Sequence, residues 1–475
     1  MKSEILKYIP VNLANFVVSF GAVTILTRIL SDNEYGRYVL VIAILNFVHM
    51  GLFTWLEAAM SRFHERASVD DNLSTHFKSL YTFAFGLILV IVPLSLILIY
   101  VLPMDDRLTM LLTFGMVGTS IQLFHGITME GHKAAHRIGR YSGVYSTEII
   151  LKFILGVIII MITPIQELGP FIGIVIAASI AVLIELPGML KRSKGGRFDK
   201  KLIREYFNYG GPICFSLILG YALVNGDLFF IRYFINDAAV GGYGAGYSFA
   251  NTFLSYIFVW LSMAVMPTAI SSLERQGKET ATQVLLDYGN ILIVVTMPVA
   301  VGIALVSKDI GFIMGEPVRE TAVMIMPWIA IAALLNGFIN LYIYQAYVLA
   351  KKLNILAILM VPPVLMNCAL NIWLIPIHGL YGAVISTLCA YSLGVILCII
   401  GAKRVFVLPL PLIAFLKTSL SCAAMTLIVL SLNLPEAWPD IVTLAIKAGS
   451  GAIVYVVMTY LLNPANIRQW VTSKT

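Results

Sequence analysis

Two residues of opposite charge, Glu148 and Lys152, lie four positions apart within a long apolar stretch of the sequence. On an α-helix that spacing places both side chains on one face, where they can neutralise each other. A charged side chain at the centre of a bilayer costs at least about 3 kcal/mol unless it is paired or faces water. The pair is therefore either structural, or a site at which Glu148 holds Lys152 ready to bind an anion in a cavity. The residues leave both interpretations open.

Arg28 and Arg232 each close an apolar stretch, at matching positions of a sequence repeat described below. Anchoring at a membrane interface would explain either arginine alone, whereas the matched positions favour a shared role around a central cleft. Asp227 precedes Arg232 by about 7–8 Å of helical rise, so we expect it to influence Arg232 and to change its own charge during a working cycle. Glu57 lies near the inner end of its stretch, where water is within reach.

Amide side chains in the same apolar stretches would give a cleft hydrogen-bonding capacity, although amides also hold helices together. The candidates are Asn15, Asn46, Asn225 and Asn251. The five cysteines lie in apolar runs without the spacing of a metal or redox pair, so no metal site is expected. The segment GKET at Gly277 lacks the upstream glycine of a phosphate-binding loop, because residue 272 is serine. Transport driven by nucleotide hydrolysis within this chain is therefore not expected.

The elements that carry these residues are membrane helices. Hydrophobic residues make up 59% of the 475 residues and charged residues only 12%, about half the charged share of a soluble protein. A helix needs about 20 apolar residues to cross a bilayer. We therefore predict an all-α integral membrane protein with about fourteen transmembrane helices, at residues 9–30, 38–60, 80–102, 108–130, 143–163, 168–190, 209–231, 244–270, 283–306, 320–348, 355–376, 379–400, 411–432 and 440–462.

The lysines and arginines predict the orientation. With the N-terminus inside, alternate loops place 24 basic residues, including Lys2, Arg468 and Lys474, on the inner side and six on the outer side. Basic residues are retained on the cytoplasmic side of short loops, so both termini are expected to be cytoplasmic. The basic residues form no continuous face, which argues against a nucleic-acid partner.

A repeat divides the chain into similar halves. The segment LTRILSDNEYGRYVL (Leu26–Leu40) resembles FIRYFINDAAVGGYGA (Phe230–Ala245), with Tyr38 matching Tyr243, and TPIQELGPFIG (Thr163–Gly173) resembles IPIHGLYG (Ile375–Gly382). We predict a six-helix lobe at 1–190, a basic cytoplasmic linker at 191–208, a second lobe at 209–400 and two further helices at 401–475. Parallel six-helix repeats would place a site near the membrane midplane between the lobes.

The opening segment NLANFVVSFGAVTILTRILSDNEYGRYVLVIAILN (Asn12–Asn46) and the segment IPIHGLYGAVIST (Ile375–Thr387) resemble Wzx-type polysaccharide flippases. These proteins belong to the multidrug/oligosaccharidyl-lipid/polysaccharide exporter superfamily. Lipid II flippases of that superfamily usually carry an Arg–Asp pair early in the first span, where this chain has the uncharged segment Asn12–Gly21.

The resemblance implies that an undecaprenyl-pyrophosphate-linked oligosaccharide, the repeat unit of an O-antigen or exopolysaccharide, crosses the bacterial cytoplasmic (inner) membrane by alternating access. It also implies a central cavity lined by spans 1, 2, 7 and 8. Arg28, Lys152 and Arg232 would then bind the pyrophosphate, with the four asparagines nearby, while Asp227, Glu148 and Glu57 would serve as coupling groups or charge partners. Membrane lipids and a polysaccharide polymerase are the expected partners. No cofactor is expected, and coupling to a proton or sodium gradient is a further hypothesis.

Two other functions fit parts of the sequence less well. A multidrug or cation antiporter shares the expected architecture, but it should have more acidic than basic residues in its cleft. A membrane glycosyltransferase or polymerase would need a large outer loop to build a catalytic site, and the outer loops predicted here are all short. We therefore expect a transporter and no enzymatic activity.

Overall fold

The computed structural model describes residues 7–164, 166–435 and 437–465, without the side chains of residues 263, 264, 266 and 267. Within this described part the secondary structure is helical, with no strand. Thirteen of the described helices are long and apolar enough to cross a membrane. The predicted all-α membrane fold is thereby confirmed. Lys2, Arg468 and Lys474, which the sequence assigned to inner loops, lie outside the described residues.

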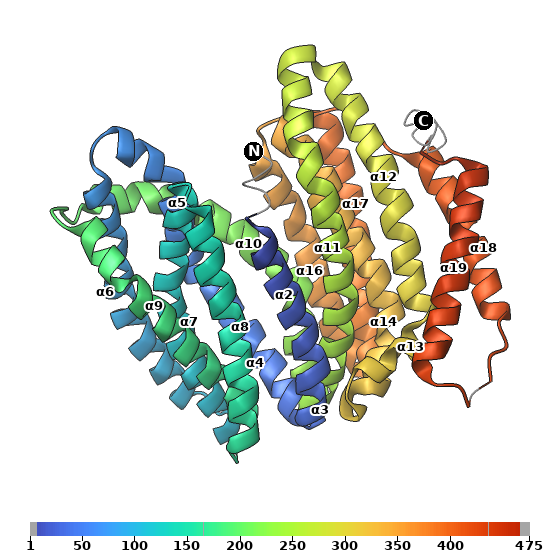
Figure 1. Cartoon of the computed structure of the whole chain (residues 1–475), viewed down its shortest axis with the longest axis horizontal. Helices are drawn as coiled ribbons and strands as arrows, with labels where there is room; N and C mark the ends of the chain where they lie inside the picture. Colours follow the sequence, from blue (N-terminus) through green and yellow to red (C-terminus); the bar gives the residue numbers. More distant parts are fainter. Residues whose placement is uncertain (1–6, 165, 436, 466–475) are drawn as a thin grey trace. The chain divides into compact units, whose positions relative to one another are not determined.

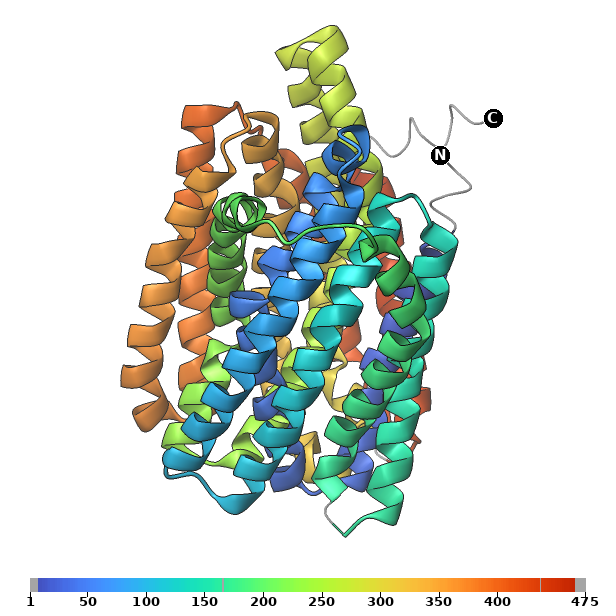
Figure 2. The same ribbon diagram turned by 90° about the vertical axis from the view of Figure 1, so that its left-hand side faces the viewer.

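The chain divides into two compact units, Met1–Asn225 and Gly226–Thr475, and the boundary falls inside α10. In the first unit α8 packs against α2 and α9, while α7 packs against α4, α5, α6 and α9. Figure 2 shows the helices of this unit running side by side. The elements are α2 (Ile9–Gly21), η1 (Ala22–Leu26), α3 (Thr27–Ile29), α4 (Asp32–Leu52), α5 (Thr54–Val69), α6 (Leu73–Val101), α7 (Asp106–Ala134), α8 (Ile138–Ile162), η2 (Gln166–Leu168), α9 (Gly169–Ser193) and α10 (Lys200–Phe234).

In the second unit α11 packs against α12 and α14, and α16 packs against α17. The last two helices, α18 and α19, pair with each other, and α18 contacts α12. The elements are α11 (Asp237–Gln276), α12 (Lys278–Leu305), α13 (Ser307–Ile310), η3 (Gly311–Ile313), α14 (Glu316–Gly337), η4 (Phe338–Ile343), α15 (Tyr344–Leu349), α16 (Leu353–His378), α17 (Leu380–Val405), α18 (Leu412–Ser431) and α19 (Asp440–Leu462).

The predicted span 244–270 lies within α11, a helix of 40 residues. At about 1.5 Å per residue this helix is about 60 Å long, twice the thickness of a hydrocarbon core. Figure 1 shows the α11–α12 hairpin extending beyond the neighbouring end of α17. The hairpin tip carries Arg275, Lys278 and Glu279, whose charges suit water and not lipid.

The helices that follow the matched arginines begin with side-chain caps. At the start of α4, the Ser31 hydroxyl accepts a hydrogen bond from the Glu34 amide, and the Glu34 carboxylate accepts one from the Ser31 amide at 3.0 Å. At the start of α11, Asn236 Oδ1 accepts from the Ala239 amide at 2.8 Å. Such caps satisfy amide groups that have no partner within the helix. The repeat in the sequence therefore recurs as a local structural pattern.

The first span is not a uniform α-helix. Between α2 and α3 it contains one π-helical segment, η1, and Arg28 is the second residue after it. A second π-helical segment, η4, separates α14 from α15. Single π-helical turns inside α-helices are frequent at functional sites, because they change the direction in which side chains point.

Candidate functional site

A cavity inside the first unit contains two of the residues singled out by the sequence, Lys152 from α8 and Asn46 from α4. Its volume is about 260 Å³, and α2, η1, α7 and α9 supply the rest of its wall. Gln122, Thr119 and Tyr38 add further polar groups to an otherwise mainly apolar lining. Lys152 lies near the middle of the 25-residue helix α8, so the cavity lies well inside the helix layer.

The Glu148–Lys152 pair forms as the spacing predicts, but its two members have different surroundings. The Lys152 ammonium lies 3.7 Å from a Glu148 carboxylate oxygen. Glu148 is 4% exposed and also accepts a hydrogen bond from Gln122 Nε2 at 3.4 Å, whereas Lys152 lines the cavity. An ammonium has three donors, and one contact at this distance leaves donors for a second acceptor. The arrangement can therefore hold an anionic oxygen next to hydroxyl and amide groups.

Close packing of α8 on α9 fixes the backbone at Lys152. A Cβ atom on Gly173 of α9 would lie 2.6 Å from the Lys152 carbonyl oxygen and 2.7 Å from the Gly156 nitrogen, so only glycine fits. The matching residue of the repeat, Gly382, allows the same approach between α16 and α17, where a Cβ would overlap the Leu374 carbonyl group. The repeated glycine segments thus bring the fifth and sixth helices of each half together.

Glu57 forms an ion pair with a neighbouring histidine. Its Oε1 atom lies 3.2 Å from His49 Nε2, and both side chains are mostly buried. His49 is at the end of α4 and Glu57 is at the start of α5, on either side of Phe53, where the helix is interrupted. The predicted continuous span 38–60 is therefore two helices, joined at this ion pair.

Asp227 in α10 is fully buried and is held by hydrogen bonds from neutral donors. Tyr243 Oη donates to its carboxylate at 2.7 Å and Asn371 Nδ2 at 2.6 Å, and the Thr387 hydroxyl donates as well. Asn371 also donates to Asn367 Oδ1 at 3.1 Å. These donors come from α11, α16 and α17, so the carboxylate lies where four helices meet.

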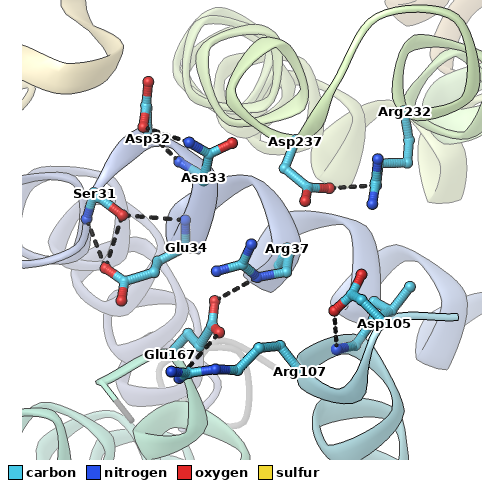
Figure 3. Close-up of polar contacts among 11 residues, drawn as sticks. Ser31, Asp32, Asn33, Glu34, Arg37, Asp105, Arg107, Glu167, Arg232 and Asp237 are labelled. Atoms are coloured by element: carbon cyan, nitrogen blue, oxygen red, sulfur yellow. Dashed lines mark hydrogen bonds and ion pairs between the residues drawn. The ribbon is translucent and has the colours of Figure 1, made fainter. Parts of the chain in front are cut away.

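The expected partnership of Asp227 with Arg232 is replaced by another ion pair. Arg232 Nε contacts the Asp237 carboxylate at the start of α11 (Figure 3). In the first unit, Arg37 Nε lies 2.8 Å from Glu167, which is completely buried and also has Arg107 at 3.9 Å. Figure 3 shows this second group beside the Ser31–Glu34 cap.

The other candidates are not brought to the cavity of the first unit. Arg28 is exposed on α3, and Asn15 donates from Nδ2 to the Val11 carbonyl oxygen of its own helix at 3.0 Å. Asn225 is half-buried at the end of the first unit. Asn251, in α11, is also half-buried, and its Oδ1 atom is shielded from solvent. None of the four lines the cavity that contains Lys152.

Several polar residues of these sites were not among the candidates from the sequence: Tyr38, Gln122, Tyr243, Asn367, Asn371 and Thr387. The repeat did contain a signal, because Tyr38 and Tyr243 occupy matching positions and each contributes to a polar site. Asn367 and Asn371 also carried a signal, since two amides one helical turn apart share a face.

The architecture is similar to that of solved membrane transporters. The structure described as "Lipid II flippase MurJ, inward closed conformation" aligns with a TM-score of 0.77 and 14% identity, covering 98% of this chain and 100% of MurJ. An inward-facing MATE family multidrug transporter of the MOP superfamily aligns with a TM-score of 0.66 and 11% identity, covering 83% and 94% of the two chains. The eukaryotic MATE transporter AtDTX14 aligns with a TM-score of 0.57 and 12% identity, covering 96% and 99%. The chain is thus a multi-pass membrane protein with the fold of the MOP superfamily.

The sequence defines its family more closely. Residues 3–274, more than half of the chain, match the profile of the family described as "Polysaccharide biosynthesis protein". The chain belongs to this family. No curated protein sequence matches it.

Proposed function

We propose that this protein is a Wzx-type flippase that moves an undecaprenyl-pyrophosphate-linked oligosaccharide repeat unit across the bacterial cytoplasmic membrane for surface polysaccharide synthesis. The headgroup enters from the inner side, and alternating access releases it at the outer side while the polyprenyl tail stays in lipid. Transport requires no enzymatic step. Both termini are cytoplasmic, as the distribution of basic residues indicates.

The observation that carries this proposal is the position of Lys152 beside several polar groups in a mainly apolar cavity well inside the helix layer. Burying a cation there costs free energy unless an anion or water contacts it. Glu148, at 3.7 Å, is only a loose partner. An anionic pyrophosphate fits an ammonium group, while sugar hydroxyls fit Asn46, Gln122 and Tyr38. Membership of a polysaccharide biosynthesis family and a fold shared with a lipid II flippase support a lipid-linked sugar as the cargo.

The function is tested in a strain that lacks the gene. The position of the lipid-linked repeat unit is measured by the access of an impermeant sugar-modifying reagent to the outer face. We expect the unit to be made and to stay inside, and the wild-type gene to restore its export. Normal arrival of the unit at the outer face would show that the protein moves something else, and multidrug or cation antiport would then be the leading function.

The site is tested in the same strain with matched variants. Lys152→Gln should stop export, and Lys152→Arg should retain part of it, because it keeps the charge. Glu148→Gln/Lys152→Gln separates the two interpretations, because it leaves no unpaired charge. A pair that only stabilises the fold would let this double variant export normally, whereas an anion site would leave it inserted and inactive. Arg28→Ala and Arg232→Ala should also impair export, and full export with Arg28, Lys152 and Arg232 all replaced would remove these assignments.

We further propose that Asp227 couples export to a proton or sodium gradient. Its complete burial among neutral donors supports a group that binds a cation at one stage of the cycle. Within the described residues, an ionised carboxylate there has hydrogen bonds but no countercharge in contact with it. Asp227→Asn is expected to insert normally and to make export insensitive to collapse of the gradient. Export that responds to the gradient equally in the wild type and in Asp227→Asn would exclude this role.

A further inference from the structure

A second concave site of the first unit lies where α10 leaves the basic 191–204 segment. It has a volume of about 390 Å³ and is lined by residues of α4, α5, α6 and α10. Lys200 and Arg204 both line it and are exposed. Because they are four residues apart on one helix, their side chains lie on the same face of α10.

The rest of the groove is apolar and aromatic. The ring of Trp55 lies 5.4 Å, centroid to centroid, from the rings of both Phe83 and Phe207, in edge-on contacts. Trp55 is buried, and its indole nitrogen donates to the Leu52 carbonyl oxygen at 3.0 Å. Phe207, in contrast, is 56% exposed. The groove therefore has an aromatic wall that the fold leaves uncovered within the first unit.

The charged and apolar parts are separated along the helix axes. Lys200 is the first residue of α10, and Phe207 lies about 10 Å further along that helix. Phe83 and Leu87 lie about 15–20 Å into α6, which begins at Leu73. The cations are thus at the end of the helix layer, and the aromatic and aliphatic side chains point to greater depth. A lipid has the same division, with a charged headgroup at the surface and chains beneath it.

The end of the groove that contains Lys200 carries a strongly positive charge. The segment 191–204 has seven basic residues and one acidic residue. That acid, Asp199, accepts a hydrogen bond from the Lys201 amide at 2.7 Å, and Glu205 is held by Arg66 through two bonds of 2.6 and 2.8 Å. Among the ion pairs found in the described residues, none involves Lys200 or Arg204. Within the part of the chain that the structure describes, Lys200 and Arg204 therefore have no protein counterion.

We propose that this groove binds a membrane phospholipid with a net negative headgroup, in the leaflet on the side of the 191–204 segment. The phosphodiester contacts Lys200 and Arg204, and an acyl chain lies against Phe207, Phe83 and Leu87. Basic pockets between membrane helices recognise anionic headgroups because two neighbouring cations can both form charge-assisted hydrogen bonds to one phosphate group. This inference is independent of the proposed transport function, since the groove contains none of the residues assigned to the cargo.

The test compares lipid retention by the purified, delipidated full-length protein in native mass spectrometry. The probes are phosphatidylglycerol and phosphatidylcholine with identical acyl chains. The wild type is expected to retain phosphatidylglycerol with roughly thirtyfold preference, as two basic residues near an anionic headgroup would give. Lys200→Gln/Arg204→Gln should lose that preference. Lys194→Gln/Arg197→Gln removes the same charge from the same segment outside the groove and should keep it.

Further measurements decide whether the groove binds a lipid or only a phosphate group. Glycerophosphoglycerol, which has the headgroup but no acyl chains, should not displace the lipid, and Phe207→Ser should weaken retention of both lipids. Lys152→Gln should keep the preference, which separates this groove from the cargo site. Equal loss in both double variants would show diffuse attraction to the basic segment, and displacement by the headgroup alone would show a simple phosphate site. Either result would overturn the proposal, provided that circular dichroism shows the variants to be folded.

Discussion

Lys447 lies within the last helix, and its partner is far away in the sequence. Its ammonium lies 2.8 Å from the carboxylate of Asp309 in α13, and the Thr443 hydroxyl donates to the same carboxylate at 3.0 Å. The contact joins α19 to the segment between α12 and α14. A charged residue in a terminal helix is thus satisfied by a charge in a short connecting helix.

This ion pair should show strong coupling. Lys447→Met and Asp309→Asn are each expected to destabilise the protein by about 3 kcal/mol, because each leaves one mostly buried charge without its partner. The double variant should be more stable than either single variant. Thermal unfolding of the four proteins in detergent measures this. Additive losses in the double variant would mean that the two side chains do not stabilise each other.

Residue types were easier to find from the sequence than their partners. An acid in an apolar stretch identified Asp227, and the nearest cation along the helix suggested Arg232 as its partner. Its actual donors, Tyr243, Asn371 and Thr387, are 16, 144 and 160 residues away. The Glu148–Lys152 pair was predictable because one helix turn determines it, whereas contacts between helices depend on packing that local spacing does not encode.

At the scale of the elements, the contact between α8 and α9 should be sensitive to a single methyl group. Gly173→Ala is expected to cost about 1–3 kcal/mol, because its Cβ would overlap the backbone at Lys152 and Gly156. Gly143→Ala is the matched control in α8, since a Cβ there meets no atom within 4 Å. The midpoint of thermal unfolding should fall for the first variant and stay the same or rise for the second. Equal midpoints would mean that α9 can move away from α8 at little cost.

The approximate number of helices could be predicted from hydrophobic length: about fourteen were expected, and thirteen of the described helices can span a membrane. The ends of the helices could not be predicted in this way. A window of about 20 apolar residues detects a span and says little about how far the helix continues into water. The 40 residues of α11 and the 35 of α10 therefore exceed the predicted blocks. The break at Phe53 was also missed, because residues 38–60 are apolar on both sides of it.

The orientation of the whole molecule is a prediction that labelling can test. In a variant without the five native cysteines, Asp106→Cys should react with an impermeant maleimide added to intact cells. Lys194→Cys should react only after the membrane is permeabilised, because the basic segment is expected inside. The opposite pattern would invert the topology and place the proposed phospholipid groove in the outer leaflet.

The sequence repeat corresponds to several paired features of the structure. Matching segments give two capped helix starts, two glycine contacts between neighbouring helices and two tyrosines at polar sites. The polar sites themselves differ, since one contains a lysine and the other an aspartate held by amide and hydroxyl groups. The halves share an architecture that similar segments can specify, while their polar sites contain different chemical groups.

The π-helical segment η1 gives the first span an unusual property. A π-turn closes its hydrogen bond over five residues where an α-turn uses four, so Ala22–Leu26 contains one residue more than a regular helix needs. A π-turn rotates less per residue than an α-turn, and this smaller rotation offsets the extra residue. Removal of one residue there would therefore restore a continuous α-helix and leave Arg28 facing nearly the same direction relative to Asn15. The same deletion from a regular part of the helix would instead rotate every later side chain by about 100°. Within η1, the first span can thus lose a residue without turning Arg28 away from its neighbours.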